Sequence, residues 1–546
     1  MKTVVLGFDA LDERYLDRFA DSLPAITELR ERGISCTLES THPPWTGSAW
    51  PSMYTGTDPS HHGVFGFFRY DTYPDDGALI SRMDVRRPAL WDYLSSEGRP
   101  SVVMNVPVTH PPDPIAGVLI PGYLAVEEER GHPEGIRDEL SKEIGEAYTI
   151  YSRGEISDDL EEKFEGYLAL IDQRRRAGLA LLENYEWELA VLQVQKTDAV
   201  FHNFDDDEHF REIYAAADRF VADVVEAVDD ETNVVLCSDH GIGPVTGYQI
   251  HVNEILREHG FVETTDRSTS PSLSTKKASL VGDEVEDRSV SSDTDPGTLG
   301  ASLIAAGRLS RKLGLDPSAV YTVAERIGIE GALLRHTPDS LREAAVERVD
   351  WRESRAYCAD GSRMGIRINL VGREPEGSVP PSEYERVRDE LIEVLSEVET
   401  PDGEPAFEFV CRREEMYDGP YAKDGPDVLF LPTEMNHTIS TKLYGRRFVS
   451  IDDHDHKRDG TFVGYGPGFA EDFDGDRLSL TDVAPITMAL LGRPVPTLMT
   501  GTVPDGLLVG ETTWANYGEV TYGTAVEDST IDDERVTEKL EDLGYL

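Results

Sequence analysis

Three aspartates stand where apolar runs of the sequence end, and two of them have a histidine close by. Asp9 ends TVVLGF, Asp198 follows LAVLQVQKT, and Asp239 follows NVVLCS. His202 lies four residues after Asp198, and His240 is next to Asp239. Carboxylate oxygen and imidazole nitrogen are common ligands of zinc and similar divalent ions, and two such ions can hold a phosphoryl group for in-line displacement. A lone aspartate at a strand end is more often a turn or cap residue, but three with histidines favour a metal site.

A hydroxyl nucleophile for such a site is available in residues 41–67, THPPWTGSAWPSMYTGTDPSHHGVFGF. The prolines of HPP hold the chain extended until Thr46, Gly47 and Ser48, which open a predicted helix. At a helix N-terminus, backbone N–H groups can hold a phosphoryl oxygen while a metal lowers the pKa of the Thr46 hydroxyl. The alternative is that Thr46 or Ser48 caps the helix and does nothing more.

The elements that must position these residues alternate along residues 1–262, where short apolar runs are separated by amphipathic helical segments. This alternation is typical of an α/β protein with a largely parallel sheet, and the continuous apolar character of the strands predicts that helices cover both faces. Ligands of such sheets bind beyond the carboxyl ends of the strands, where the aspartates stand. The predicted strands are TVVLGFD, SVVMNV, GVLIPG, LAVLQVQ and NVVLCSD.

Composition divides the chain further. We predict residues 1–262 as the first part of a catalytic α/β core and the Ser-, Thr- and Asp-rich residues 263–300 as a flexible polar insert. Residues 301–350 are expected to form a helical insert or cap. Strand and helix patterns return in 351–505, the second part of the core, and residues 506–546 form a C-terminal tail.

The formal net charge of -52, from 104 acidic and 52 basic residues, resembles that of proteins from salt-accumulating halophiles. Such a surface repels nucleic acid and anionic membranes, so neither is expected as a partner. No window contains the roughly 18 to 20 apolar residues of a membrane span, and no signal peptide is evident, which predicts a cytoplasmic protein without membrane insertion. Too scattered for a metal knuckle, the cysteines are expected to be free thiols: Cys36, Cys237, Cys358 and Cys411.

The motifs occur in an order that resembles the alkaline phosphatase superfamily, and within it the type I phosphodiesterase/nucleotide pyrophosphatase family. They are GFDA at the first strand, a threonine followed nine residues later by TG and then PSHHGVFGF, TDAVFH, SDHG and a late HKRDGTFVGYGPG. The resemblance covers residues 1–255 and about 350–505. It implies an alkaline-phosphatase-like core, with a mostly parallel central sheet flanked by helices on both faces and an inserted helical cap.

The resemblance also implies a two-metal site, with zinc or manganese as the ions. It assigns Asp9, Thr46, Asp239 and His240 to one ion, and Asp198, His202 and a late histidine to the other. That histidine is His456, four residues before the glycine of GTFVGYGPG, with His454 as the alternative. Metal-bound Thr46 would attack phosphorus and form a phospho-threonine intermediate, which water or another hydroxyl then attacks. His42, His62 and His251 are expected to be structural.

One departure from the family affects substrate binding. Nucleotide pyrophosphatases carry TxPN from the nucleophile onward, whereas this chain has TGSA, so Ala49 stands in place of the phosphate-binding asparagine. We therefore expect Gly47 and Ser48 to contact the phosphoryl group of a small-molecule phosphate ester.

The prediction is a hydrolase of phosphoric ester bonds, most plausibly of a diester or pyrophosphate. A phosphomonoesterase, phosphotransferase or phosphomutase with the same site is the alternative. Thr46 in place of Cys or Ser disfavours a sulfatase, and the complete set of ligand residues disfavours a catalytically silent binding protein.

The acidic composition predicts that folding depends on salt. At about 1 M salt the screening length falls to roughly 3 Å, so that repulsion between surface carboxylates largely disappears. Dialysis from molar salt into dilute buffer should therefore unfold the protein, as followed by circular dichroism. Unchanged spectra from molar to millimolar salt would contradict the halophile interpretation.

Overall fold

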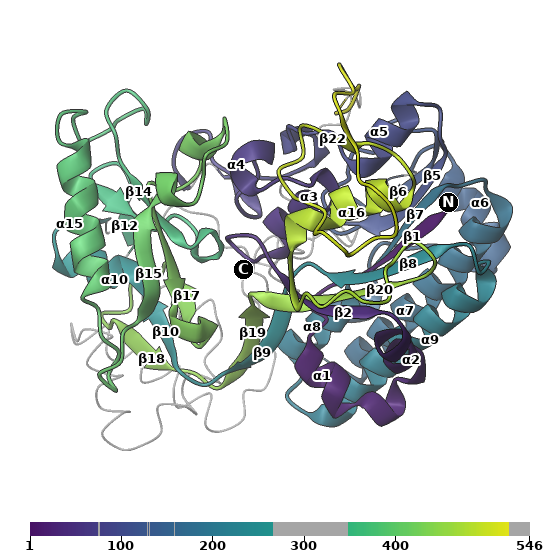
Figure 1. Ribbon diagram of the computed structural model, residues 1–546. Coiled ribbons are helices and arrows are strands. Elements are labelled where there is room, and N and C mark those ends of the chain that lie inside the picture. The colour runs from purple at the N-terminus through teal and green to yellow at the C-terminus, as the bar shows by residue number, and fades with distance from the viewer. Residues whose placement is uncertain (75–76, 128, 130, 158, 266–347, 524–546) are drawn as a thin grey trace.

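The computed structural model describes residues 1–74, 77–127, 129, 131–157, 159–265 and 348–523, which form two lobes of unequal size (Figure 1). The larger lobe contains an eight-stranded sheet between two layers of helices, and the smaller lobe contains its own sheets. Within these ranges no helix is both long and apolar enough to cross a bilayer.

The large sheet has the strand order β21-β2-β20-β8-β1-β7-β5-β6. All pairings in it are parallel except those of β20, which runs antiparallel to both β2 and β8. The mostly parallel sheet predicted from the sequence is thus confirmed, and all five predicted strands are present. The strands are β1 (Thr3–Phe8), β2 (Ile34–Glu39), β5 (Ser101–Val106), β6 (Gly117–Pro121), β7 (Leu189–Val194), β8 (Asn233–Ser238), β20 (Asp459–Tyr465) and β21 (Arg477–Ser479).

Helices cover both faces of this sheet because successive side chains of each strand point to opposite sides. In β1, Val5 packs into one core, whereas Val4 and Leu6 pack into the other. The first core is closed by α3 (Thr46–Thr55), α5 (Leu90–Ser96) and α16 (Val483–Leu490). The second is closed by α1 (Glu13–Arg18), α2 (Pro24–Arg32), α6 (Ile136–Ile144), α7 (Leu160–Asn184), α8 (Lys196–Asn203) and α9 (Asp207–Ala227).

The smaller lobe has a separate core, built from an antiparallel sheet of order β13-β14-β16-β15 and a three-stranded sheet of order β17-β10-β18. Helix α15 (Tyr384–Ser396) packs on the first of these sheets, and α10 (Val252–Glu258) belongs to the same core. The strands are β10 (Tyr248–His251), β13 (Ala356–Tyr357), β14 (Gly365–Ile368), β15 (Phe407–Arg412), β16 (Val428–Pro432), β17 (Thr438–Ser440) and β18 (Phe448–Ser450).

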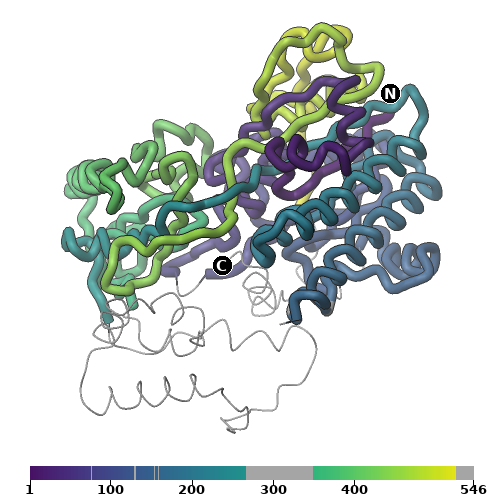
Figure 2. The backbone as a smooth tube through the Cα atoms, turned by 90° about the horizontal axis from the view of Figure 1, so that it is seen from below, coloured from purple at the N-terminus to yellow at the C-terminus, as the bar shows by residue number. Residues whose placement is uncertain are grey.

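An antiparallel ribbon joins the lobes. It pairs β9 (Gly241–Val245), which leaves the large sheet after β8, with β19 (Asp453–Lys457), which returns to β20. Figure 2 shows these two segments of the chain running side by side between the lobes. The chain thus enters and leaves the smaller lobe through neighbouring strands.

The predicted second part of the core, residues 351–505, contributes to both lobes. Residues up to 450 build the smaller lobe, whereas β20, β21, α16 and the short strand β22 (Val495–Pro496) belong to the large one. The polar insert and helical cap predicted for 263–350 lie almost entirely outside the described residues. Their ends are described as strands: β11 (Glu263–Thr265) pairs antiparallel with β12 (Arg348–Asp350), so the last residues of the predicted helical insert are extended. All four cysteines are free thiols, as predicted.

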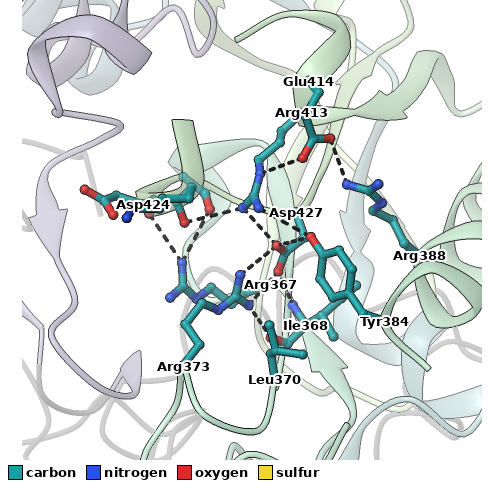
Figure 3. Close-up of polar contacts among 12 residues, drawn as sticks. Arg367, Ile368, Leu370, Arg373, Tyr384, Arg388, Arg413, Glu414, Asp424 and Asp427 are labelled. Atoms are coloured by element: carbon teal, nitrogen blue, oxygen red, sulfur yellow. Dashed lines mark hydrogen bonds and ion pairs between the residues drawn. The ribbon is translucent and has the colours of Figure 1, made fainter. Parts of the chain in front are cut away.

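A buried carboxylate organises the smaller lobe (Figure 3). Asp427 is fully buried at the start of β16 and accepts both guanidinium nitrogens of Arg373 at 2.7 Å. Arg413 donates to it at 2.9 Å, and the Tyr384 hydroxyl and the Ile368 N–H each donate at 2.7 Å. Burial alone would raise the pKa of Asp427, but the hydrogen bonds and charges of these arginines lower it below its ordinary value. The carboxylate therefore ties β14, β16 and α15 together.

Replacing this carboxylate should destabilise the protein. We expect Asp427→Asn to lower the free energy of unfolding by about 3 kcal/mol, because it removes the buried carboxylate that two partly buried guanidinium groups share. Urea denaturation at constant high salt measures the loss. The control is Asp424→Asn, which breaks a half-exposed ion pair with Arg86 and should cost less than about 1 kcal/mol. Equal losses for the two variants would contradict this role of Asp427.

Candidate active site and metal centre

The three predicted aspartates meet at the carboxyl end of the large sheet. Asp9 directly follows β1 and Asp239 directly follows β8, while Asp198 lies in α8, the helix that follows β7. The strands β8, β1 and β7 are neighbours in the sheet, so their carboxyl ends converge. All three carboxylates are buried. The sequence prediction that strand-end residues gather at one place is borne out by this geometry.

Thr46 is the first residue of α3, and its hydroxyl faces these carboxylates. Its Oγ1 lies 3.3 Å from Oδ1 of Asp9 and 3.3 Å from Nε2 of His240. The N-cap position belongs to Trp45, which makes no side-chain cap hydrogen bond. The alternative that Thr46 or Ser48 only caps the helix is therefore wrong, and the Thr46 hydroxyl is available for chemistry.

One group of metal-ligating atoms surrounds this hydroxyl. Nε2 of His240 lies 3.2 Å from Oδ2 of Asp239 and 3.5 Å from Oδ1 of Asp9. One ligand atom from each of these residues falls within 4.8 Å of the others. Together with Thr46 they are the residues predicted to hold the first ion.

A second group adjoins the first. Oδ1 of Asp198 lies 3.3 Å from Nε2 of His202 and 3.4 Å from Nε2 of His456. The rings of His240 and His456 stack with their centroids 3.9 Å apart, so the two groups are contiguous. His454, the alternative, instead packs against the rings of Phe201 and Phe210, at 5.5 and 5.1 Å. The structure thus places His456, and not His454, beside Asp198.

Two of the histidines, His240 and His456, present an unprotonated ring nitrogen to this cluster. Nδ1 of His240 lies 3.0 Å from the carbonyl oxygen of Gly241, and Nδ1 of His456 lies 3.3 Å from that of Pro44. A carbonyl only accepts, so each Nδ1 carries the proton and each Nε2 keeps its lone pair. Burial lowers the pKa of both histidines to about 4, so both are neutral at pH 7.

Lone pairs of nitrogen and oxygen that face one another repel unless a proton or a metal ion lies between them. Burial, reinforced by the charges of Asp239 and Asp198, raises the pKa of Asp9 well above its ordinary value. Burial likewise raises the pKa of Asp239, whose buried Oδ2 accepts no hydrogen bond from any residue that the structure describes. A buried carboxylate left in this state is costly unless a proton or a metal neutralises it. Oxygen and imidazole donors in this arrangement fit divalent cations such as zinc or manganese.

His202 differs from the other two histidines. Burial would lower its pKa, but the charge of Asp198 and a hydrogen bond to it raise the value to about 9. In return, and against the effect of burial, His202 and His456 hold the pKa of Asp198 well below its ordinary value. In the absence of metal, His202 thus supplies a counter-charge for Asp198.

Three further side chains position Asp9, and the sequence analysis missed them. Nε1 of Trp50 and Nε2 of Gln193 each donate to Oδ2 of Asp9 at 3.3 Å. Asn105 in turn donates to Oε1 of Gln193 at 2.7 Å. Gln193 interrupts the otherwise apolar strand LAVLQV, a signal that could have revealed it. A Cβ at Gly7 would come within 2.4 Å of the Trp50 ring, so glycine there lets the indole reach Asp9.

The predicted substrate-binding residues have different environments. The Ser48 hydroxyl donates to the carbonyl of Pro43 at 2.9 Å and lies 3.1 Å from that of Trp45, so its proton is used within the protein. Gly47 lies in the first turn of α3, ahead of the helical hydrogen bonds, and its N–H faces the same end of the helix as Thr46. Ala49, at the position of the family asparagine, is buried in the core.

The histidines set aside as structural lie apart from the two groups. Nε2 of His62 lies 2.9 Å from the hydroxyl of Ser52, and Nδ1 of His251 lies 3.1 Å from the carbonyl of Lys442. His42 precedes Pro43 and packs its ring against Phe409. Burial lowers the pKa of all three, to about 3 for His62 and about 4 for the other two.

A mostly parallel sheet with a threonine hydroxyl at a helix start and buried carboxylate and imidazole groups at its strand ends is the architecture of an alkaline-phosphatase-like hydrolase of phosphoric esters. The chain belongs to the type I phosphodiesterase/nucleotide pyrophosphatase family, whose model matches residues 3–296. The predicted family and enzyme class are therefore confirmed. No curated protein matches the sequence.

Solved structures with the same fold include phosphonoacetate hydrolase from Sinorhizobium meliloti 1021 in complex with phosphonoformate. That chain is 15% identical at a TM-score of 0.54, and the alignment covers 90% of this chain and 95% of that one. Its complex with phosphonoacetate aligns with the same score and coverage at 14% identity. Human ectonucleotide pyrophosphatase/phosphodiesterase 5 is 12% identical over 93% of this chain and 100% of that one, at a TM-score of 0.49.

Divalent metal should stabilise the folded protein. Adding Zn²⁺ or Mn²⁺ to metal-free protein neutralises the clustered carboxylates, and free metal at a hundred times Kd would contribute about 2.7 kcal/mol. Calorimetric melting at constant high salt, with and without chelator, measures the effect.

Asp239→Asn should remove most of this stabilisation. The control is Asp58→Asn, in the partly exposed group of Asp58, His61 and Asp418, which should leave the response to metal unchanged. A wild-type protein whose melting temperature does not change when metal is added would contradict the assignment of a metal site.

Proposed function

We propose that the protein hydrolyses phosphodiester or pyrophosphate bonds of a small-molecule substrate, with Thr46 as the nucleophile. The observation that carries this proposal is the position of the Thr46 hydroxyl, which lies 3.3 Å from both Asp9 and His240 at the start of a buried helix. Membership of the type I phosphodiesterase/nucleotide pyrophosphatase family supports the bond type. The net charge of -52 favours a small substrate over nucleic acid, and supports work in the cytoplasm of a salt-accumulating cell.

The two groups of ligand atoms would hold two divalent ions, zinc in the first instance and manganese as the alternative. Asp9, Asp239 and His240, with the Thr46 oxygen, would hold one. Asp198, His202 and His456 would hold the other. When bound, the ions supply the positive charge that lowers the pKa of the hydroxyl and stabilises the oxygens around phosphorus.

The residues of the chain position and activate the nucleophile. Asp9 accepts the Thr46 hydroxyl, and Trp50 and Gln193 fix Asp9 by donating to its other oxygen. The N–H of Gly47, at the positive end of α3, is placed to bind a phosphoryl oxygen in the absence of the family asparagine.

Thr46 would attack phosphorus as the bond to the leaving oxygen breaks, giving a phospho-threonine, and the hydroxyl proton would pass to the leaving oxygen. Water would then attack the same phosphorus on the side opposite the Thr46 oxygen, and that oxygen would leave with one proton from the water, which restores the hydroxyl. Transfer to another hydroxyl instead of water would make the enzyme a phosphotransferase or phosphomutase.

Removing the nucleophile should abolish turnover. With metal in high salt, Thr46→Ala is expected to lower kcat for bis-p-nitrophenyl phosphate by at least about a thousandfold, while Thr46→Ser keeps a hydroxyl and part of the activity. Release of p-nitrophenolate measures both, and melting curves confirm folding. Full metal-dependent activity of Thr46→Ala would show the mechanism to be wrong. A wild-type preference for p-nitrophenyl phosphate would overturn the diesterase assignment in favour of a monoesterase.

A further inference from the structure

The arginines buried in the described part of the chain are Arg82, Arg174, Arg363 and Arg388, and three of them have acceptors for their guanidinium groups. Arg82 lies 2.7 Å from Asp92 and 3.0 Å from Asp113. Arg388 pairs with Glu385 and Glu414, both at 2.7 Å (Figure 3). Arg174 donates to a side-chain amide and two carbonyl oxygens. The rule that buried polar groups are hydrogen-bonded thus holds for these three, two of which also have carboxylate partners.

Arg363 is the exception. It ends a short 3-10 helix of the smaller lobe, Gly361–Arg363, and only 8% of its surface is exposed. Its guanidinium makes no hydrogen bond and no ion pair with any described residue, and its buried Nε has no acceptor. The carboxylate whose charge acts on it is Asp360, but Oδ1 of that residue accepts from the N–H and hydroxyl of Ser362. The guanidinium lies over the rings of Phe65 and Tyr70, 5.9 and 5.2 Å from their centroids.

The side chain of Arg363 lies beside residues 65–67, which contact the start of α3 next to Thr46. A Cβ added to Gly66 would meet Cγ of Arg363 at 3.1 Å, so glycine at this position permits the approach. A Cβ added to Gly47, the residue after the nucleophile, would in turn meet the carbonyl oxygen of Gly66 at 3.1 Å. Residues 65–67 therefore contact the start of α3 on one side and Arg363 on the other. An arginine of the smaller lobe is thus held next to the candidate active site of the larger lobe.

A buried guanidinium without a counter-charge destabilises the folded protein, whereas a buried neutral group without a partner destabilises it much less. His42 illustrates the difference, because its buried Nε2 also lacks an acceptor. Burial lowers the pKa of His42 to about 4, so that it is neutral at pH 7. An arginine side chain stays protonated at pH 7 even when it is buried. Its planar pair of N–H donors matches the oxygens of a carboxylate or a phosphoryl group. Among the described residues, none supplies the anion that would complete the environment of Arg363.

We propose that Arg363 binds a second anionic group of the substrate, a carboxylate or a further phosphoryl group, while Thr46 attacks the first. The substrates would then be phosphate or phosphonate compounds with two anionic groups close together. This rests on the proposed function for the position of the reacting phosphorus, but the affinity of Arg363 for the second group is measurable without turnover. Arg363 thereby sets specificity and takes no part in bond cleavage.

The experiment is isothermal titration calorimetry of the metal-loaded protein in high salt with three ligands. Ethylphosphonate has no second anionic group, phosphonoacetate adds a carboxylate, and methylenediphosphonate adds a phosphoryl group. The wild-type protein should bind at least one of the two larger anions about tenfold more tightly than ethylphosphonate, as one charged hydrogen bond allows. Which of the two gains identifies the second group as carboxylate or phosphoryl.

Arg363→Met should bind ethylphosphonate like the wild-type protein and lose the tenfold preference, and Arg363→Lys should keep part of it. The control is Arg388→Gln, a buried arginine of the same lobe with two glutamate partners, which should keep the whole preference. A wild-type protein without the preference, or an Arg363→Met variant that retains it, would overturn the proposal.

Two readouts separate this proposal from its alternatives. Arg363→Met should melt at or above the wild-type temperature, because it removes a buried charge that has no ion pair, and a clear fall would instead make Arg363 structural. Failure of the proposed function would appear as activity that survives in Thr46→Ala, whereas the binding preference would be unaffected.

Discussion

Three carboxylates buried within reach of one another are the constraint on which the rest of this structure depends. Asp9, Asp198 and Asp239 are almost completely excluded from water, and their mutual repulsion opposes folding unless cations or protons lie between them. The sheet makes the arrangement possible, because the neighbouring strands β8, β1 and β7 deliver their following residues to one edge. Burial of these carboxylates carries an electrostatic cost at this edge, and the proposed metal ions would offset it.

The sequence predicted the parts of this arrangement that have strong local patterns. Apolar runs identify β1, β5, β6, β7 and β8, and the residues that end them are those that meet in the structure. The place of β20, antiparallel between β2 and β8, could not be predicted, because an apolar run carries no information on strand direction. The roles of Trp50 and Asn105 in positioning Asp9 could not be predicted either, since both depend on contacts between residues far apart in the chain.

Choosing between His454 and His456 shows a different limit. Both precede the same glycine by a few residues, so the family pattern left two candidates. The choice depends on the pairing of β19 with β9, which sets His456 opposite Ile242 and brings its ring over His240. Pairing register is a tertiary property, and a shift by one residue would turn the side chain to the other face. The environment of Ser48 could not be predicted for a related reason: the carbonyls that bind its hydroxyl belong to the bend before α3, which sequence spacing does not reveal.

The position of the site also explains why the molecule has two lobes. His240 immediately precedes β9 and His456 lies in β19, so the ribbon that connects the lobes carries a candidate ligand for each ion at its root. Trp45, next to the nucleophile, packs on the cores of both lobes and lies 4.1 Å from the ring of His456. Thr46, the ribbon and the seam between the lobes therefore share one location. If Thr46 is the nucleophile, as proposed, a substrate bound there would lie beside the seam between the lobes, and residues of the smaller lobe would be close enough to affect which phosphate ester fits.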